Sequence, residues 1–240
     1  MHSLRRFFDA SIALALLLVT SPLLLIGAIG IKLSSPGPVF YRAKRIGRDR
    51  RRQRRSEPYR GREFTMYKFR TMRADTNGSS APLTQWKDSR IFPWGRVLRA
   101  TKVDELPQLI NVVKGDMALV GPRPEAPEIV RSHYGPDEID TLQVPPGVTS
   151  PGTIYYYTHC EDMLQGDGVA DVYAHRLLPL KLALDRVYLK KSTFGYDLRL
   201  LLRTFRVIVA RTFGMRQFVD PPELSQANVV GPSRAKPQED

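Results

Sequence analysis

The sequence predicts a helix-dominated α+β protein of one domain whose N-terminal segment enters a membrane. Three observations predict this fold class. An almost unbroken apolar run covers residues 12–33, two short strand-like patterns flank an arginine-rich stretch, and most of the remaining chain has helical spacing. With 240 residues and 27.3 kDa, the chain is large enough for one domain with its own hydrophobic core.

The N-terminal apolar run is long enough to cross a bilayer, which takes about 20 residues, and too long for the apolar region of a secretory signal. Ser21-Pro22 lies at its middle, where proline removes a backbone hydrogen bond and kinks a helix. A kinked spanning helix would separate Arg5-Arg6 from the basic stretch that follows, against the bias towards cytoplasmic positive charge. A re-entrant helix–break–helix keeps both on one side. These residues alone leave the two forms open.

A small β-hairpin with a basic loop is predicted after the membrane segment. Residues 39–41 and 63–70 have strand composition, and residues 48–62 form the exposed loop of this hairpin. Residues 42–73 hold fourteen Lys and Arg against three Asp and Glu, in a chain of formal net charge +13. Such a loop suits anionic membrane lipids. Nucleic acid is not an expected partner, because no interleaved aromatic residues or recognisable nucleic-acid module accompany the charge.

The middle of the chain predicts short elements joined by proline- and glycine-rich turns. Helices are expected over residues 94–99, 107–113 and 125–134, and a short buried strand over 117–120. Pro107 fixes the start of the second helix, because proline clashes inside a helix but fits its first turn. Residues 143–152 predict a rigid loop, and residues 153–157 have strand propensity.

Asp104 and Glu105 stand at the N-terminus of the helix that Pro107 begins. Unpaired N–H groups and the positive end of the helix dipole stabilise an ionised carboxylate there and also attract an anionic phosphate. Arg123 follows between two prolines, which hold its guanidinium so that little entropy is lost when it binds phosphate oxygens. The combination favours phosphate chemistry, although an isolated Asp-Glu-x-Pro sequence would ordinarily indicate a helix cap.

Two long helices and a tail complete the chain. Residues 171–191 and 196–213 are predicted helices, and the second places Arg199, Arg203 and Arg206 on one face beside a hydrophobic flank. We expect this amphipathic helix to lie in the bilayer interface with its arginines at lipid phosphates, the alternative being a surface helix packed on the core. Residues 214–240 are a predicted disordered tail. The single cysteine excludes an internal disulfide, and the histidine spacing indicates no zinc.

Motifs in a fixed order give the chain a close resemblance to a known family. They are Ser21-Pro22, SPGPVFY from Ser35, YKFRTM from Tyr67, DELPQL from Asp104, KGDM from Lys114, VGPRP from Val120, PGVT from Pro146, and residues 185–197. Together they resemble the bacterial sugar transferases, the monotopic polyprenyl-phosphate phosphoglycosyl transferases, over about residues 3–213. The chain is similar to the short, catalytic-core form of that family.

The resemblance implies a reaction, a topology and a location. Family members move a sugar 1-phosphate from a UDP-sugar to undecaprenyl phosphate through a covalent aspartyl–phosphosugar intermediate, releasing UMP, at the cytoplasmic face of the bacterial inner membrane. This is the first membrane step of exopolysaccharide, capsule, O-antigen (lipopolysaccharide) or glycoprotein assembly, with downstream glycosyltransferases as expected partners. The family's membrane helix is re-entrant, so residues 1–34 are expected to enter and leave one leaflet around Ser21-Pro22. Residues 35–213 then form a membrane-associated catalytic domain.

The resemblance also implies roles for five residues. Asp104 is the expected nucleophile, and Glu105 is the expected ligand of Mg²⁺, which would neutralise charge on the departing UMP. Lys68, Arg99 and Arg123 are the expected cationic clamps on the phosphates. A non-catalytic membrane scaffold is disfavoured by the intact acidic pair and by Arg123, and a nucleic-acid binder would leave these motifs unused.

Two stretches depart from the family's pattern. The basic loop 48–62 is longer and richer in arginine than the family's usual turn, and residues 150–154 lack the Gly-Trp-Ala sequence of another family branch. Sugar choice is expected to depend on the second stretch. The sequence names neither the sugar nor the pathway, and it gives no oligomeric state.

Overall fold

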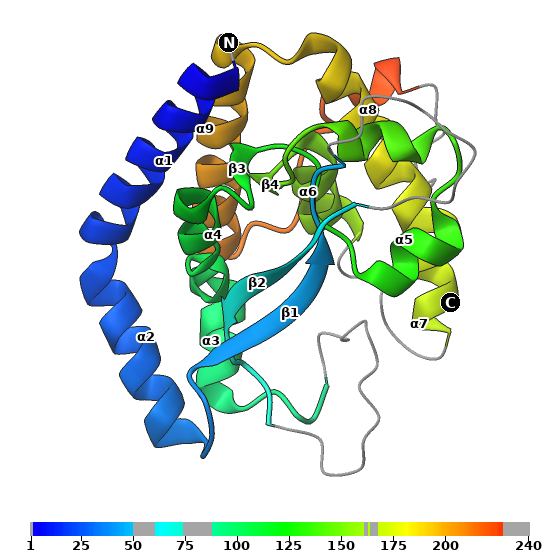
Figure 1. Cartoon of the computed structure of the whole chain (residues 1–240). Coiled ribbons are helices and arrows are strands. Elements are labelled where there is room, and N and C mark those ends of the chain that lie inside the picture. The colour runs from blue at the N-terminus through cyan, green and yellow to red at the C-terminus, as the bar shows by residue number, and fades with distance from the viewer. Residues whose placement is uncertain (1, 50–60, 74–87, 161–162, 164–167, 228–240) are drawn as a thin grey trace.

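The computed structural model describes residues 2–49, 61–73, 88–160, 163 and 168–227. In Figure 1, two N-terminal helices run along one edge of the molecule, a small hairpin lies near its centre, and further helices lie on the other side of the hairpin. The described part is a helix-dominated α+β structure, as predicted, whereas entry of the N-terminal segment into a membrane stays a prediction. Its α-helices are α1 (His2–Val19), α2 (Ser21–Ser34), α3 (Pro93–Ala100), α4 (Gln108–Lys114), α5 (Pro127–His133), α6 (Pro151–Tyr155), α7 (Val169–Val172), α8 (Leu178–Lys191) and α9 (Phe194–Thr212).

Four strands form two small sheets. The strands are β1 (Phe40–Ile46), β2 (Glu63–Phe69), β3 (Ala118–Val120) and β4 (Gly147–Thr149). Strands β1 and β2 pair antiparallel, which confirms the predicted hairpin, and β3 pairs parallel with β4. Strand β3 lies within the predicted strand 117–120, whereas β4 lies inside the stretch predicted as a rigid loop. Most of the predicted basic loop, residues 50–60, lies outside the described residues.

Helices α1 and α2 meet at the predicted break. They are bent by 62° relative to each other, and Pro22 lies in the first turn of α2. The hydroxyls of Thr20 and Ser21 donate to the carbonyl oxygens of Leu16 and Leu18 at 2.7 and 2.8 Å, so side chains compensate carbonyls near the break. Within the described chain no single helix is long and apolar enough to span a bilayer, but this bent pair together meets that test. Re-entry into a membrane stays a prediction.

The hairpin is attached to α4 by one buried amide. The Asn111 side chain donates to the carbonyl oxygen of Thr65 at 2.7 Å and accepts from the backbone N–H of Tyr67 at 3.0 Å. Asn111 is completely buried, so an unsatisfied strand carbonyl and N–H would be costly without it. This contact fixes β2, and with it Lys68, against the helix that follows Asp104 and Glu105.

The second sheet positions the turn that carries Arg123. Ala118 pairs with Gly147 across β3 and β4, and the two backbones come very close just beyond this pair. A Cβ atom on Gly147 would lie 2.1 Å from the backbone nitrogen of Gly121, so only glycine fits there. The sheet therefore holds the segment from Gly121 to Pro124 in one place.

The prediction of a strand over residues 153–157 is wrong. These residues continue α6 into a π-helical turn, Tyr156–Cys160. Ser150 caps the helix by accepting from the backbone N–H of Thr153 at 2.9 Å, and Pro151 occupies the first turn. A capped start followed by proline favours a helix locally, and here it outweighs the β propensity of the aromatic residues that follow.

The C-terminal helices are longer than predicted, and the chain beyond them packs on the fold. The predicted helix 171–191 comprises α7, a π-helical turn (Tyr173–Leu177) and α8, whereas α9 begins two residues before the predicted helix 196–213 and ends one residue before its predicted end. The two Nη atoms of Arg203 in α9 donate to the Glu223 carboxylate oxygens at 2.9 and 2.5 Å. This arginine therefore binds the protein itself, whereas it was predicted to lie at lipid phosphates. Glu223 is 3% exposed. Residues 228–240 of the predicted tail lie outside the described residues.

Candidate active site

Asp104 and Glu105 lie in a 3₁₀ turn, Val103–Glu105, between α3 and α4. The turn is closed by the backbone N–H of Glu105, which donates to the carbonyl oxygen of Lys102 at 3.1 Å. Pro107 stands at the N-cap position of α4, as its missing N–H allows. The predicted location of the acidic pair at the start of this helix is therefore confirmed.

Glu105 accepts four hydrogen bonds from three different segments. Its Oε1 atom accepts from Lys68 Nζ of β2 at 3.0 Å and from Arg123 Nη2 at 2.8 Å. Its Oε2 atom accepts from Arg123 Nη1 at 3.1 Å and from Gln108 Nε2 of α4 at 3.1 Å. Arg123 thus binds both carboxylate oxygens with its two Nη atoms, which is the strong bidentate form of this ion pair. The structure brings together three of the predicted site residues that lie far apart in the sequence.

Burial and charge act in opposite directions on this cluster. Burial alone would raise the pKa of Glu105, but Arg123 and Lys68 outweigh it and hold that pKa well below its usual range. Burial would lower the pKa of Arg123, and the Glu105 carboxylate reverses the effect and raises it. For Lys68 burial is the larger effect, and its pKa falls to about 8 in spite of Glu105. The ion pair is charged at neutral pH, and Lys68 is its most easily neutralised member.

Asp104 differs from its neighbour in its partners. Its side chain is 8% exposed, and its Oδ1 atom has no hydrogen-bond partner among the described residues. Burial and the adjacent Glu105 raise the pKa of Asp104, whereas Lys68, Lys102 and Arg99 act to lower it. A buried carboxylate with one uncommitted oxygen is poorly stabilised by the protein, and such a group is suited to form a bond to an incoming electrophile.

Arg99 is not among the donors to the Glu105 carboxylate in the described structure. Its Nε atom donates to Thr71 Oγ1 at 2.8 Å, and its Nη2 atom lies 3.1 Å from the sulfur of Met72. The structure therefore ties Arg99 to the segment after β2. It is still close enough to Asp104 for its charge to act on the pKa of that residue.

Two supporting residues were not predicted for the site. Gln108 is completely buried, donates to Glu105, and leaves its Oε1 atom without a partner within the described chain. Asp185 of α8 accepts from the backbone N–H groups of Gly152 and Arg123, so it holds the Arg123 segment from behind, and burial raises its pKa to about 6. Both belong to family-like motifs, but nothing in the sequence shows that α8 reaches the Arg123 turn.

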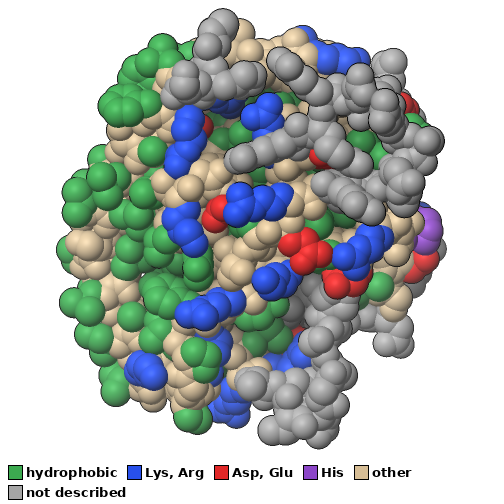
Figure 2. All heavy atoms as spheres, in the orientation of Figure 1, with side chains coloured by type: hydrophobic (Ala, Val, Ile, Leu, Met, Phe, Trp, Pro, Cys, Tyr) green, Lys and Arg blue, Asp and Glu red, His purple; other side chains and the backbone are tan. Residues whose placement is uncertain are grey.

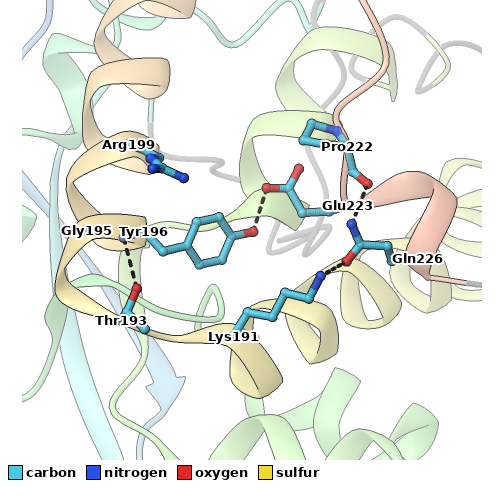
Figure 3. A pocket seen from close by; sticks show the side chains of 8 residues that line it. All are labelled: Lys191, Thr193, Gly195, Tyr196, Arg199, Pro222, Glu223 and Gln226. Atoms are coloured by element: carbon cyan, nitrogen blue, oxygen red, sulfur yellow. Dashed lines mark hydrogen bonds between the residues drawn. The ribbon is translucent and has the colours of Figure 1, made fainter.

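The cavity in Figure 3 lies away from the acidic pair. Its volume is about 330 Å³, and it lies between the start of α9 and the C-terminal turn, residues 222–226. There the Tyr196 hydroxyl donates to Glu223 at 2.5 Å. Its walls contain none of the predicted site residues. Its lining is Lys191, Thr193, Gly195, Tyr196, Arg199, Pro222, Glu223 and Gln226. We therefore do not assign the acidic pair's chemistry to this cavity.

Asp104 is buried and the adjacent Glu105 is held by Lys68 and Arg123, an arrangement that can bind phosphate groups. The sequence profile of the family described as bacterial sugar transferase matches residues 1–211. The chain belongs to this family, whose relatives are transferases of the phosphoglycosyl kind.

Named relatives of this chain use different sugars. It is 35% identical over 202 residues to a UDP-glucose:undecaprenyl-phosphate glucose-1-phosphate transferase of Caulobacter vibrioides, covering 83% of this chain and 67% of that protein. It is 31% identical to a UDP-N-acetylgalactosamine-undecaprenyl-phosphate N-acetylgalactosaminephosphotransferase of Aeromonas hydrophila, covering 89% of this chain and 45% of the relative. An uncharacterized sugar transferase, EpsL of Bacillus subtilis, is 31% identical over 86% of this chain and 87% of its own length. Some relatives are thus much longer than the part that this chain matches.

Proposed function

We propose that this chain transfers a sugar 1-phosphate from a UDP-sugar to undecaprenyl phosphate through a covalent intermediate on Asp104. The observation that carries the proposal is the asymmetry of the acidic pair. Both Glu105 oxygens are occupied by Lys68, Arg123 and Gln108, whereas Asp104 keeps an oxygen without a partner in the described structure. Family membership and the names of the relatives support the substrate classes.

The proposed reaction has two displacements at one phosphorus atom. In the first, the Asp104 carboxylate attacks the phosphorus that carries the sugar, and the bond to the bridging oxygen breaks so that UMP leaves. In the second, an oxygen of undecaprenyl phosphate attacks the same phosphorus, which restores the carboxylate and gives the undecaprenyl-diphosphate sugar. No proton is needed in either step. Lys68 and Arg123, which contact Glu105, would offset the charge of the phosphate groups.

Magnesium is part of the proposal, and the oxygen atoms at the pair suit it. Mg²⁺ prefers carboxylate and amide oxygens and keeps several other ligands from substrate and water. Gln108 Oε1 lacks a partner within the described structure, so it fits this donor type, while Asp104 Oδ1 is left for the attack on phosphorus. Glu105 would join Gln108 if phosphate oxygens drew Lys68 and Arg123 away from it. When bound, the ion would supply charge neutralisation for the leaving UMP.

The proposed location is the cytoplasmic face of the bacterial inner membrane. Figure 2 shows hydrophobic side chains gathered along the edge formed by α1 and α2. Helix α9 has an exposed apolar stripe that includes Phe194, Leu198 and Phe205. The ring of Phe8 in α1 lies 6.2 Å from that of Phe194, so the exposed faces of α1 and α9 meet. A lipid surface in contact with both faces would cover this apolar area.

Mass spectrometry and a UMP-release assay test the proposal together. The purified protein is given UDP-glucose or UDP-N-acetylgalactosamine with Mg²⁺, first alone and then with a polyprenyl phosphate. We expect donor alone to add the mass of the donor's sugar phosphate, hexose phosphate or N-acetylhexosamine phosphate, to the peptide that contains Asp104, and acceptor to remove it. Asp104→Asn should abolish both the adduct and UMP release while staying in the membrane fraction. Near-native turnover by this variant would refute the intermediate.

A further inference from the structure

We propose that Lys102 is a further substrate-binding residue, which contacts the diphosphate of the donor in the reaction proposed above. The proposal rests on three features of this residue: a strained backbone, an aromatic ring that holds its ammonium group, and its place beside the acidic pair. Neither the predicted site nor the family-like motifs include it.

The backbone of Lys102 adopts a conformation that lysine disfavours. Its φ and ψ angles are 57° and 15°, in the left-handed region, and within the described residues all others with positive φ are glycines. An L-residue with a Cβ atom loses free energy in this conformation, whereas glycine does not. Strain of this kind persists when surrounding structure imposes it, and it clusters at functional sites. Because the turn itself would be easier to form with glycine, the lysine side chain must supply something else.

The side chain of Lys102 makes a cation–π contact with the ring of Tyr157. Its Nζ atom lies 3.9 Å from the centre of the Tyr157 ring, an arrangement in which the ring face attracts the cation. Tyr157 is fixed in turn by Arg211 of α9, whose guanidinium lies 4.4 Å from the same ring and donates to the Tyr157 carbonyl oxygen. Tyr157 and Arg211 are each 8% exposed. The ammonium group therefore has a fixed support that reaches back to α9.

Lys102 is a further cation beside the acidic pair, and its described contact differs from those of the other cations. Lys68 and Arg123 bind the Glu105 carboxylate, and Arg99 binds Thr71. Lys102 precedes Asp104 by two residues, and its charge acts on the carboxyl groups of both Asp104 and Glu105. A donor diphosphate adds negative charge to a site that already holds two carboxylates, so a further cation beside the pair would assist binding.

Three substitutions separate the charge of Lys102 from its strain. Lys102→Met removes the charge and keeps the strain, Lys102→Gly removes both, and Lys102→Arg keeps both. Lys114→Met is the matched control, because Lys114 also lies over a tyrosine ring, at 5.2 Å from that of Tyr67, but at the far end of α4. The measurements are the rate of adduct formation at low donor concentration and the midpoint of thermal unfolding.

We expect Lys102→Met and Lys102→Gly to slow adduct formation about tenfold to a hundredfold, and Lys102→Arg and Lys114→Met to stay within about threefold of the native rate. The Lys102→Gly protein should unfold at or above the native temperature in spite of its lower rate, because glycine relieves the strain. If Lys102→Gly lost rate and thermal stability together, the role would be structural and the proposal wrong. Near-native rates for both Lys102→Met and Lys102→Gly would also overturn it.

Calorimetry with UDP separates this proposal from the proposed transfer reaction. UDP carries the diphosphate but no sugar, so its binding needs no turnover. We expect Lys102→Met to weaken UDP binding about tenfold and Lys114→Met to leave it unchanged. If the native protein bound UDP in a Lys102-dependent way but formed no adduct and released no UMP, the transfer reaction would fail and the lysine's role would stand. If the native protein formed the adduct and both Lys102 variants matched it, only the lysine's role would fail.

Discussion

Lys68 keeps its positive charge at a position where burial opposes it. The residue lies on β2, and its Nζ atom contacts Glu105 at 3.0 Å with only 18% of the side chain exposed. Burial lowers its pKa to about 8 from the ordinary 10.5, although the nearby carboxylates act to raise it. An arginine at the same position would stay charged at any pH used in an assay. The choice of lysine therefore makes this contact sensitive to mild alkali.

The pKa of Lys68 predicts an alkaline limit for the reaction. Below pH 8 the lysine is charged, as its proposed role at the donor phosphates requires, and above pH 8 it is neutral. We expect kcat/KM for the UDP-sugar to fall as pH rises through about 8, and Lys68→Arg to move this fall to higher pH. The exposed lysine of β1, changed in Lys44→Arg, is the control and should leave the profile unchanged. An unchanged profile in Lys68→Arg would show that another group sets the limit.

The sequence predicts which residues form the site better than it predicts their contacts. Asp104, Glu105, Lys68 and Arg123 all lie in motifs, and the last three meet in the structure as one ion-pair cluster. Arg99 was expected among the same clamps, yet it binds Thr71, because the direction of α3 decides what its side chain reaches. Distances between segments depend on packing, which residue spacing along the chain does not encode.

At the scale of elements, correct predictions came from strong local signals. The proline breaks before α2 and α4 and the hairpin strands each follow from a few adjacent residues. The parallel pairing of β3 with β4 joins segments about thirty residues apart, so no local pattern predicts it. In the structure the pairing brings the backbones of Gly121 and Gly147 close together. Likewise, the C-terminal turn is held by Glu223 on Arg203, an ion pair between distant residues that composition alone does not predict.

The N-terminal arginines of α1 join that helix to other elements of the fold, Arg6 to α4. The sequence presents Arg5 and Arg6 as charges that orient the membrane helix. In the structure, Arg6 donates to the carbonyl oxygens of Val112 and Val113 at 2.5 and 2.6 Å, in the last turn of α4. A cation there adds donors to the last carbonyls of the helix, although that of Val112 also accepts from the backbone N–H of Gly115 at 3.1 Å, and it lies at the negative end of the helix dipole. Helix α1 and the helix that begins just after the acidic pair are thus directly connected.

Replacing Arg6 is expected to destabilise the fold. Arg6→Met removes two charge-assisted hydrogen bonds, and a loss of about 1–3 kcal/mol in the free energy of unfolding follows from their usual strength. Urea unfolding of the detergent-solubilised protein measures it. Arg42→Met, on the exposed side of β1, should change the free energy by less than about 0.5 kcal/mol. Equal stability of the two variants would mean that Arg6 contributes only to orientation.

At the scale of the whole molecule, the apolar surface and the acidic pair are joined through few elements. Helices α1 and α2 carry the exposed apolar edge, and α1 packs on α4, which begins just after Asp104 and Glu105. A transferase acting between a soluble nucleotide sugar and a lipid phosphate needs its nucleophile near a lipid surface. The short path from α1 through α4 to the acidic pair fits that requirement. It further requires that the two ends of the bent helix pair, α1 and α2, face the same side of the membrane.

Cysteine labelling tests this topology. Two variants, Ser3→Cys and Asp49→Cys, place a cysteine before and after the apolar run. A membrane-impermeant maleimide is then applied to intact spheroplasts or to inverted vesicles. The native Cys160 can stay, because it is 1% exposed and burial raises its thiol pKa to about 12, so it should remain unlabelled until denaturation. We expect both engineered cysteines to react only in inverted vesicles, since a re-entrant pair leaves both flanks in the cytoplasm. A spanning helix would instead expose residue 3 in spheroplasts and residue 49 in inverted vesicles, and that result would exclude re-entry.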